Sequence, residues 1–182
     1  DREGDFEQTP EIVLSAYDGE RIVYLTSPHN PSGSTVDLAD VERIAEETGD
    51  DTLVVVDEAY GEFADVDSAV ALLEGRNGFE ARDDVAVLRT FSKAYGLAGL
   101  RLGYAVVPGE WADAYARVNT PFAASEIACR AGLAAIEDEE HVERTLETAR
   151  ESREYMRRRL DAHVWPSEGN FVLVAVGDAT AV

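Results

Sequence analysis

The chain has 182 residues, a formal net charge of −21, 45% hydrophobic residues and 29% charged residues. This composition is typical of a water-soluble globular protein, with either one sizeable core or one large domain and part of another. The negative charge argues against nucleic acid or an anionic membrane surface as a partner, because both would repel the chain. No run of about 20 apolar residues and no signal-peptide pattern occurs, so we expect a cytoplasmic protein without a membrane span.

Acidic residues far outnumber basic ones, with 37 Asp and Glu against 16 Lys and Arg. They alternate with apolar residues at helical and strand spacing, which argues against a disordered acidic segment. Acid-rich surfaces suggest adaptation to very high salt, where the Debye length falls to about 3 Å or less and self-repulsion is screened. We therefore expect a protein of halophilic type.

Short apolar strands alternate with amphipathic helices along the chain. A strand over 21–27 stops at a turn, and residues 37–48 place Leu38, Val41 and Ile44 on one helical face. Further strands are expected over 52–56, 85–88 and 102–107, and further helices over 67–74, 110–118 and 124–137. Strands without polar alternation, in this order, predict an α/β fold with a mostly parallel sheet covered by helices and joined by crossovers.

The last quarter of the chain predicts a change of domain. A long, highly charged helix is expected over 139–162, and strand character returns over 170–176. We expect residues 1–138 to be part of a large domain, and residues 139–182 to be a bridging helix and the beginning of a small C-terminal α+β domain. Because nothing after the last strand closes that small domain, we expect the chain to be an internal fragment of a larger protein.

Few residues offer metal or thiol chemistry. The single cysteine, Cys129, excludes an internal disulfide, and its alanine-rich helical setting predicts a buried side chain. His29, His141 and His163 are too scattered along the sequence for a zinc site, so we expect no metal. No glycine-rich phosphate motif stands between a strand and a helix in the manner of nucleotide-binding folds.

The single lysine, Lys93, stands in the glycine-rich stretch FSKAYGLAGLRLGY (91–104), whereas the other fifteen strong cations are arginine. Arginine is always charged, but a lysine can lose its proton and become a nucleophilic amine. A lone lysine is most often a solvated surface residue. Its neighbours in space therefore decide between a surface role and a chemical one.

Polar side chains follow three of the predicted strands. Ligands bind beyond the carboxyl ends of the strands in parallel α/β sheets. The residues delivered there are Asn30, Asp57, Tyr60, Thr90, Ser92 and Lys93. Each has an ordinary alternative, such as a turn residue for Asn30 or a helix cap for Asp57. In the same way, Tyr60 could be a core residue and Arg101 a solvated charge. The convergence of these polar residues on one edge of the sheet nevertheless favours a binding site.

The combination of groups fits pyridoxal phosphate, the commonest cofactor that uses an amine nucleophile to form a Schiff base. This cofactor requires a lysine, for which Lys93 is the candidate, and a carboxylate beside the pyridinium nitrogen, for which Asp57 is the candidate. The other candidates are Asn30 and Tyr60 for the ring hydroxyl, and Thr90, Ser92 and Arg101 for the phosphate. The low dielectric at the end of an apolar strand would strengthen the pair between Asp57 and the pyridinium.

A resemblance to fold-type I aminotransferases of classes I and II rests on three motifs: HNPSG (29–33), VVVDEAYGEF (54–63) and RTFSKAYGLAGLRLGY (89–104). Asn30 lies 27 residues before Asp57, and Arg101 lies eight residues after Lys93, which resembles the histidinol-phosphate aminotransferase subfamily in an acid-rich form. The stretch WPSEGNFVLV (165–174) is similar to the strand that family has in its small domain. The similarity covers essentially the whole chain.

The resemblance implies a role for each matching residue. Lys93 would hold the cofactor as a Schiff base and move a proton between the substrate α-carbon and the cofactor, while Asp57 would pair with the pyridine nitrogen. The ring oxygen would be bound by Asn30 and Tyr60, and the phosphate by Thr90, Ser92 and Arg101. An amino group would pass from glutamate to imidazole acetol phosphate and give histidinol phosphate for histidine biosynthesis.

The resemblance also implies groups that this chain lacks. A phosphate-binding loop and a tyrosine from the second subunit of a homodimer would lie upstream of residue 1, and the substrate-binding arginine beyond residue 182. We therefore expect a fragment that is inactive alone, from a homodimer acting on small amino acids and oxo acids. Alternatives are another class I/II aminotransferase of aromatic or aspartate type, or a threonine-phosphate decarboxylase-like enzyme. A non-enzymatic module is favoured least, because binding alone could use arginine at position 93.

Overall fold

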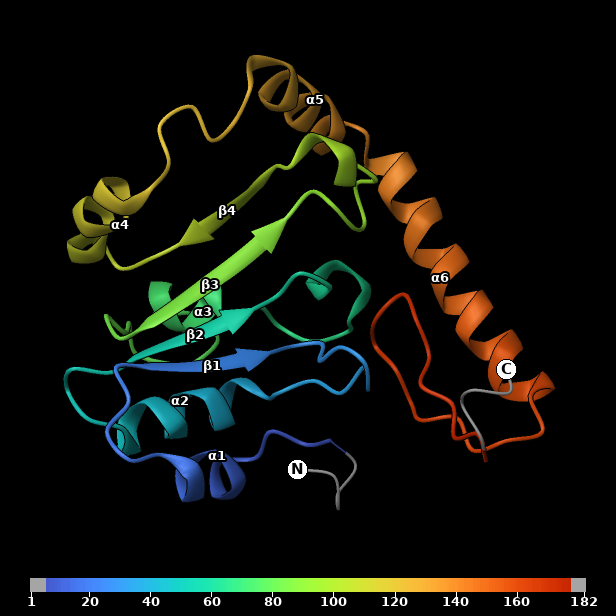
Figure 1. Ribbon diagram of the computed structural model, residues 1–182, viewed down its shortest axis with the longest axis horizontal. Coiled ribbons are helices and arrows are strands. Elements are labelled where there is room, and N and C mark those ends of the chain that lie inside the picture. Colours follow the sequence, from blue (N-terminus) through green and yellow to red (C-terminus); the bar gives the residue numbers. More distant parts are fainter. Residues whose placement is uncertain (1–5, 178–182) are drawn as a thin grey trace.

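The computed structural model describes residues 6–177, and a four-stranded sheet of order β1-β2-β3-β4 lies at its centre (Figure 1). Its strands are β1 (Ile22–Thr26), β2 (Leu53–Asp57), β3 (Val85–Thr90) and β4 (Gly103–Val106). The helices are α1 (Pro10–Ala16), α2 (Leu38–Glu47), α3 (Val70–Glu74), α4 (Ala112–Val118), α5 (Glu126–Glu137) and α6 (Glu139–Arg159), and the 3-10 turns are η1 (Gly61–Phe63), η2 (Ala98–Leu100) and η3 (Gly109–Trp111). The predicted α/β fold with a mostly parallel sheet is confirmed.

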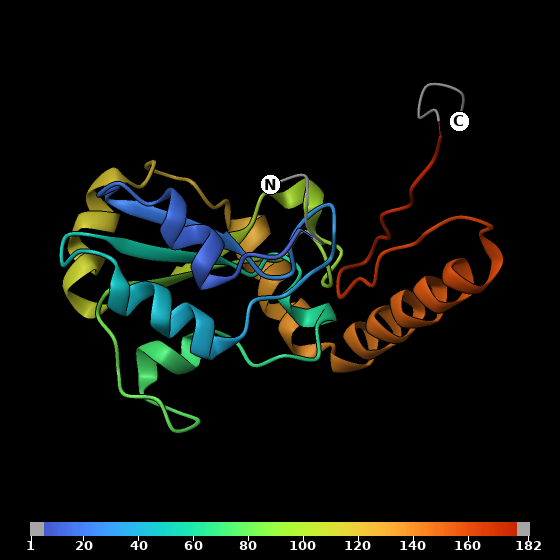
Figure 2. The same ribbon diagram turned by 90° about the horizontal axis from the view of Figure 1, so that it is seen from below.

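The core lies between one face of the sheet and the helices α2 and α3, which cover that face (Figure 2). β1, β2 and β3 run parallel, so residues in matching register share a face. The buried residues of that face are Val23, Leu25, Val54, Val56, Val85 and Val87, and they pack against Val41 and Ile44 of α2 and Leu72 of α3. On the opposite face, Ile22 and Tyr24 of β1 are exposed. Because the three strands are parallel, their carboxyl ends meet at one edge.

β4 runs antiparallel to β3, with Leu88 opposite Ala105. The chain turns back directly between these two strands, because residues 91–102 hold only the short turn η2 and no helix that could carry the chain across the sheet. The connection is closed by the Phe91 N–H, which donates to the Leu102 carbonyl over 3.1 Å. The loop that carries Lys93 therefore starts and ends at the same edge of the sheet.

The C-terminal part lies off the carboxyl ends of β1–β3 (Figures 1 and 2). α6 ends at Arg159, close to the predicted end of the charged helix. The predicted strand over 170–176 is wrong, because residues 163–175 pair only through an isolated bridge between Val164 and Val174. A longer strand requires a neighbouring strand along its whole length, and the described residues 6–177 offer none there.

α5 packs on the rest of the molecule through its smallest residues. Ala128 is buried, and a side chain added at Gly132 would meet Leu102 and Phe91. Cys129 lies beside this stripe and is exposed, so the predicted burial of its side chain is wrong. A helix rich in small residues can bury only a narrow stripe of its surface. Its alanine-rich composition does not show which residues belong to that stripe.

Candidate active site

The predicted site residues lie where the parallel strands end. Asn30 follows β1, Asp57 is the last residue of β2, and Thr90 is the last residue of β3. Tyr60 lies in the segment after β2, and Lys93 lies in the loop after β3. The shared direction of the three strands brings these segments to one edge of the sheet, as their sequence positions predict.

Lys93 and Asn30 both contact Tyr60. The Lys93 Nζ atom lies 4.9 Å from the centre of the Tyr60 ring. The Asn30 side-chain amide donates to the Tyr60 hydroxyl over 3.2 Å. Phe171, from the segment after α6, packs edge-on against the same ring with centroids 5.0 Å apart. No carboxylate of residues 6–177 forms an ion pair with Lys93, although the chain carries 37 of them.

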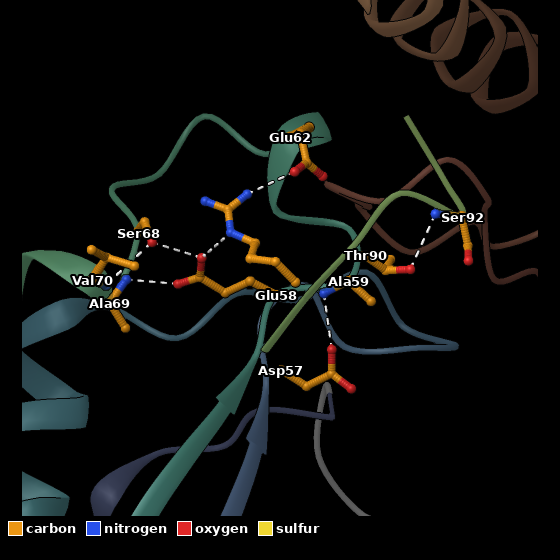
Figure 3. Close-up of polar contacts among 10 residues, drawn as sticks. Asp57, Glu58, Ala59, Glu62, Ser68, Ala69, Val70, Thr90 and Ser92 are labelled. Atoms are coloured by element: carbon orange, nitrogen blue, oxygen red, sulfur yellow. Dashed lines mark hydrogen bonds and ion pairs between the residues drawn. The ribbon is translucent and has the colours of Figure 1, made fainter. Parts of the chain in front are cut away.

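Both carboxylate oxygens of Asp57 accept hydrogen bonds. The Ala59 N–H donates to Oδ1 over 2.9 Å, as Figure 3 shows, and the Tyr24 hydroxyl donates to Oδ2. Partial burial, this hydrogen bond and the negative charge of Asp57 raise the pKa of Tyr24 to about 12. Tyr24 was not predicted as a site residue, because its contact with Asp57 depends on the register between β1 and β2.

The candidate phosphate residues lie in the Lys93 loop but are not all joined. The Ser92 N–H donates to Thr90 Oγ1 over 3.1 Å (Figure 3). Arg101 has a left-handed backbone, with φ 54°, and its guanidinium donates to the Ala98 carbonyl of its own turn over 2.8 Å. Within residues 6–177, no hydrogen bond connects Arg101 to Thr90 or Ser92. The structure therefore brings Thr90 and Ser92 together and leaves Arg101 exposed beside them.

A charged cluster joins the ends of β2 and β3 (Figure 3). Arg89 Nε pairs with Glu58 Oε2 at 3.0 Å, and Arg89 Nη1 pairs with Glu62 Oε1 at 2.8 Å. Glu58 is only 5% exposed, and it also accepts hydrogen bonds from the Ser68 hydroxyl (2.7 Å) and the Ala69 N–H (2.6 Å). The cluster therefore fastens the segments that carry Tyr60 and Lys93.

The charges of this cluster are strongly affected by burial. Glu62 Oε2 is buried and has no hydrogen-bond partner among residues 6–177. Burial raises the pKa of Glu62, and this effect outweighs the attraction of Arg89. Burial lowers the pKa of Arg89, but the charges of Glu58 and Glu62 raise it more, so the net change is upward. Arg89, Glu58 and Glu62 were not predicted as a cluster, because charged residues at strand ends usually face solvent.

A cavity of about 620 Å³ lies beside the turn after β1, and it does not coincide with the candidate active site. Residues 7–9, 32–37 and 165–168 line it together with Asp40 and His163, whereas Lys93 and Asp57 do not. Among residues 6–177, no three His, Cys, Asp or Glu side chains are grouped so that they could hold a metal ion. In the same part of the chain, no helix is both long and apolar enough to cross a bilayer.

Comparisons with known proteins connect this geometry to a family. The model of the family described as aminotransferase class I and II matches residues 1–182. Proteins named histidinol-phosphate aminotransferase are 71% identical over 182 residues in Natronomonas pharaonis and 65% identical over 181 residues in Haloferax volcanii. The alignments cover 100% of this chain but only 50% and 48% of those relatives, so the chain spans about half their length.

A solved structure gives the same result at the level of the fold. Histidinol-phosphate aminotransferase from Sinorhizobium meliloti, in complex with pyridoxal-5'-phosphate, aligns with a TM-score of 0.74 and 32% sequence identity over 88% of this chain and 44% of that one. The predicted fold class, part of the large domain of fold-type I enzymes, is thereby confirmed. The two relatives named above come from halophilic archaea, in agreement with the net charge of −21. The chain belongs to the class I and II aminotransferase family.

Proposed function

We propose that the full-length protein is a pyridoxal-phosphate-dependent aminotransferase that passes an amino group from glutamate to imidazole acetol phosphate and forms histidinol phosphate. The observation that carries this proposal is the meeting of Lys93, Tyr60 and Asn30 at the sheet edge where Asp57 ends β2. The names of the close relatives support histidinol phosphate as one of the reactants, and with it a role in histidine biosynthesis.

The residues present fit the cofactor. Lys93 offers an amine that no carboxylate of residues 6–177 neutralises, in contact with an aromatic ring. Asp57 offers a carboxylate that accepts two hydrogen bonds and has about four lone-pair positions, so it can accept a further bond from a pyridinium. Asn30 and Tyr60 offer an amide and a hydroxyl side by side for a ring oxygen. Together these groups match the donors and acceptors that pyridoxal phosphate presents.

Each residue has a defined task in the proposed reaction. Pyridoxal phosphate, when bound, supplies an electron sink that stabilises negative charge on the α-carbon of an amino acid. Lys93 would hold the cofactor at its carbonyl carbon through the Nζ atom. After the substrate amino group has replaced Nζ at that carbon, the freed Nζ amine would take and hold the proton released from the substrate α-carbon. Asp57 would keep the pyridine nitrogen protonated.

The remaining residues would bind and orient. Asn30 and Tyr60 would hold the ring oxygen, and Thr90, Ser92 and Arg101 would hold the phosphate. Support for the phosphate site comes from the shared loop and from the bond between the Ser92 N–H and Thr90 Oγ1. In this proposal Arg101 exchanges its contact with the Ala98 carbonyl for one with the phosphate.

The proposal includes the organisation of the whole enzyme. Residues 1–138 would be part of a large cofactor-binding domain, and residues 139–182 would be a bridging helix and the beginning of a small domain. The direction of α6, which leads away from the sheet in Figures 1 and 2, supports this division. A homodimer would complete the site.

A direct assay of the full-length protein tests the function. We expect glutamate-dependent amination of imidazole acetol phosphate, and we expect Lys93→Ala to abolish it together with the visible absorbance of bound pyridoxal phosphate. Release of carbon dioxide from threonine phosphate, without amino transfer, would instead favour a decarboxylase on the same fold. Efficient amino transfer only to an aromatic or aspartate-derived oxo acid would agree with an aminotransferase, but it would refute imidazole acetol phosphate as the substrate.

A further inference from the structure

We infer that Tyr24 is a positioning residue for Asp57, a role that rests on the proposed function. Its hydroxyl holds the Asp57 carboxylate in one orientation, ready for a pyridinium partner. Tyr24 belongs to none of the three motifs that carry the family resemblance. It enters through the structure alone, by its hydrogen bond to Asp57 Oδ2.

The register of the sheet places Tyr24 beside Asp57. Tyr24 of β1 lies opposite Val55 of β2, and Asp57 follows Val55 by two residues on the same strand. Side chains two residues apart on a strand share a face, so Tyr24 and Asp57 are diagonal neighbours on one face. A diagonal neighbour is within reach of a long aromatic side chain, and here the hydroxyl at its tip meets the carboxylate.

The Tyr24 hydroxyl provides the second of the two hydrogen bonds that hold the Asp57 carboxylate. A carboxylate held through one oxygen can still turn about its terminal torsion, which has broad energy wells. The Ala59 N–H fixes Oδ1 over 2.9 Å, and the Tyr24 hydroxyl fixes Oδ2. Two donors on different oxygens define the carboxylate plane, and lone pairs remain for a third donor. Without Tyr24, only Oδ1 of the carboxylate would keep a hydrogen-bond donor, the Ala59 N–H.

Tyr24 is suited to this task because it remains a donor. Its pKa of about 12 keeps the phenol protonated throughout the neutral and moderately alkaline range. The side chain is also half exposed, at 53%, and it lies outside the core cluster. Removal of its hydroxyl is therefore expected to leave folding intact, which separates positioning from stability.

The test compares Tyr24→Phe with Tyr115→Phe in the full-length protein. Tyr115 is an exposed tyrosine of α4, far along the chain from Asp57, and it serves as the matched control. We expect Tyr24→Phe to raise the dissociation constant for pyridoxal phosphate about tenfold and to lower kcat by a similar factor, because one hydrogen bond to a charged group is lost. The KM for glutamate is expected to change less than about twofold. The control should match the unsubstituted protein.

A double-mutant cycle tests whether Tyr24 acts through Asp57. In an Asp57→Asn background, Tyr24→Phe should have no further effect on the dissociation constant. Equal effects in both backgrounds, or a Tyr24→Phe variant identical to the control, would overturn the inference while leaving the proposed function intact. If the unsubstituted protein neither binds pyridoxal phosphate nor transfers amino groups, the proposed function fails and the inference fails with it.

Discussion

The amine of Lys93 lies over the face of Tyr60, with 4.9 Å between Nζ and the ring centre. A cation in this position is attracted to the ring by about 0.5–1 kcal/mol at an exposed site. The same tyrosine accepts a hydrogen bond from Asn30, so one side chain connects the segments after β1, β2 and β3. The single lysine of the chain therefore has a defined place at the sheet edge.

The two functions of Tyr60 can be separated by substitution. Tyr60→Phe keeps the ring beneath Lys93 and removes the hydroxyl that Asn30 contacts. We expect about tenfold weaker binding of pyridoxal phosphate, because the proposed donor to the ring oxygen is lost. Tyr60→Leu also removes the ring and should bind more weakly still, as measured by titration of the apoprotein. Unchanged affinity in the Phe variant would show that the hydroxyl has no part in binding.

Loss of Arg89 should destabilise the fold far more than loss of a surface arginine. Arg89→Met leaves the carboxylate of Glu58, 5% exposed, without its cation, and a broken buried pair costs about 3–5 kcal/mol. Arg43→Met is the matched control, because the partners of Arg43, Glu11 and Glu47, are exposed. Urea unfolding of both variants measures the difference. Similar losses would mean that the cluster is not an energetic unit.

Glu62 predicts a specific pH dependence of stability. Its pKa is raised by burial above the usual 4.5, so the folded state binds this proton more tightly than the unfolded state. The contribution of this proton to the stability of the fold is fully present below the usual pKa, and it is lost as the pH rises through the raised pKa of the folded state. Glu62→Gln lacks this loss, so its stability relative to the unsubstituted protein should increase with pH in this window and then level off. A difference in the free energy of unfolding that stays constant with pH would contradict the assignment.

Gly33 is expected to tolerate no side chain. Its φ is +80°, and an added Cβ would overlap the side chain of Ser167, whose neighbour Glu168 donates its N–H to the Gly33 carbonyl over 2.9 Å. Gly33→Ala should therefore lower stability through both backbone strain, about 1–3 kcal/mol, and steric overlap. Gly19→Ala is the control, because Gly19 has φ +90° and no atom within 4 Å of an added Cβ. Equal unfolding temperatures for the two variants would exclude a contribution from the overlap.

High salt should stabilise this protein. With a net charge of −21, self-repulsion opposes the compact state in dilute buffer and is screened in molar potassium chloride. We expect the unfolding temperature to rise with salt concentration across this range. Equal stability in dilute buffer and in molar salt would refute the halophilic interpretation.

The part of the fold that depends on local pattern was predictable. Apolar runs predicted β1, β2 and β3, and the spacing of Val41 and Ile44 predicted α2. The rule that parallel strands end at one edge predicted that Asn30 and Tyr60 would meet near Lys93. The helix α1 was not predicted, although Thr9 caps it and Pro10 begins it; among its residues only Pro10 is buried.

The rest depends on contacts between distant segments. The direction of β4 is set by the shortness of the loop after Thr90, and residues 170–176 lack the neighbour that a strand requires. The bond between Tyr24 and Asp57 depends on strand register, which the separate apolar runs leave open. Arg89 pairs with buried carboxylates only because two strand ends are adjacent.

The covalent attachment of pyridoxal phosphate to Lys93 is the central claim, and reduction with borohydride followed by peptide mass spectrometry tests it most directly. In the full-length protein loaded with pyridoxal phosphate, we expect the reduced pyridoxyl group on Lys93, and we expect Lys93→Arg to lose both this label and the visible absorbance of the bound cofactor. Arginine keeps the positive charge but cannot act as the amine. A label on another residue, or visible absorbance that survives in Lys93→Arg, would contradict the account.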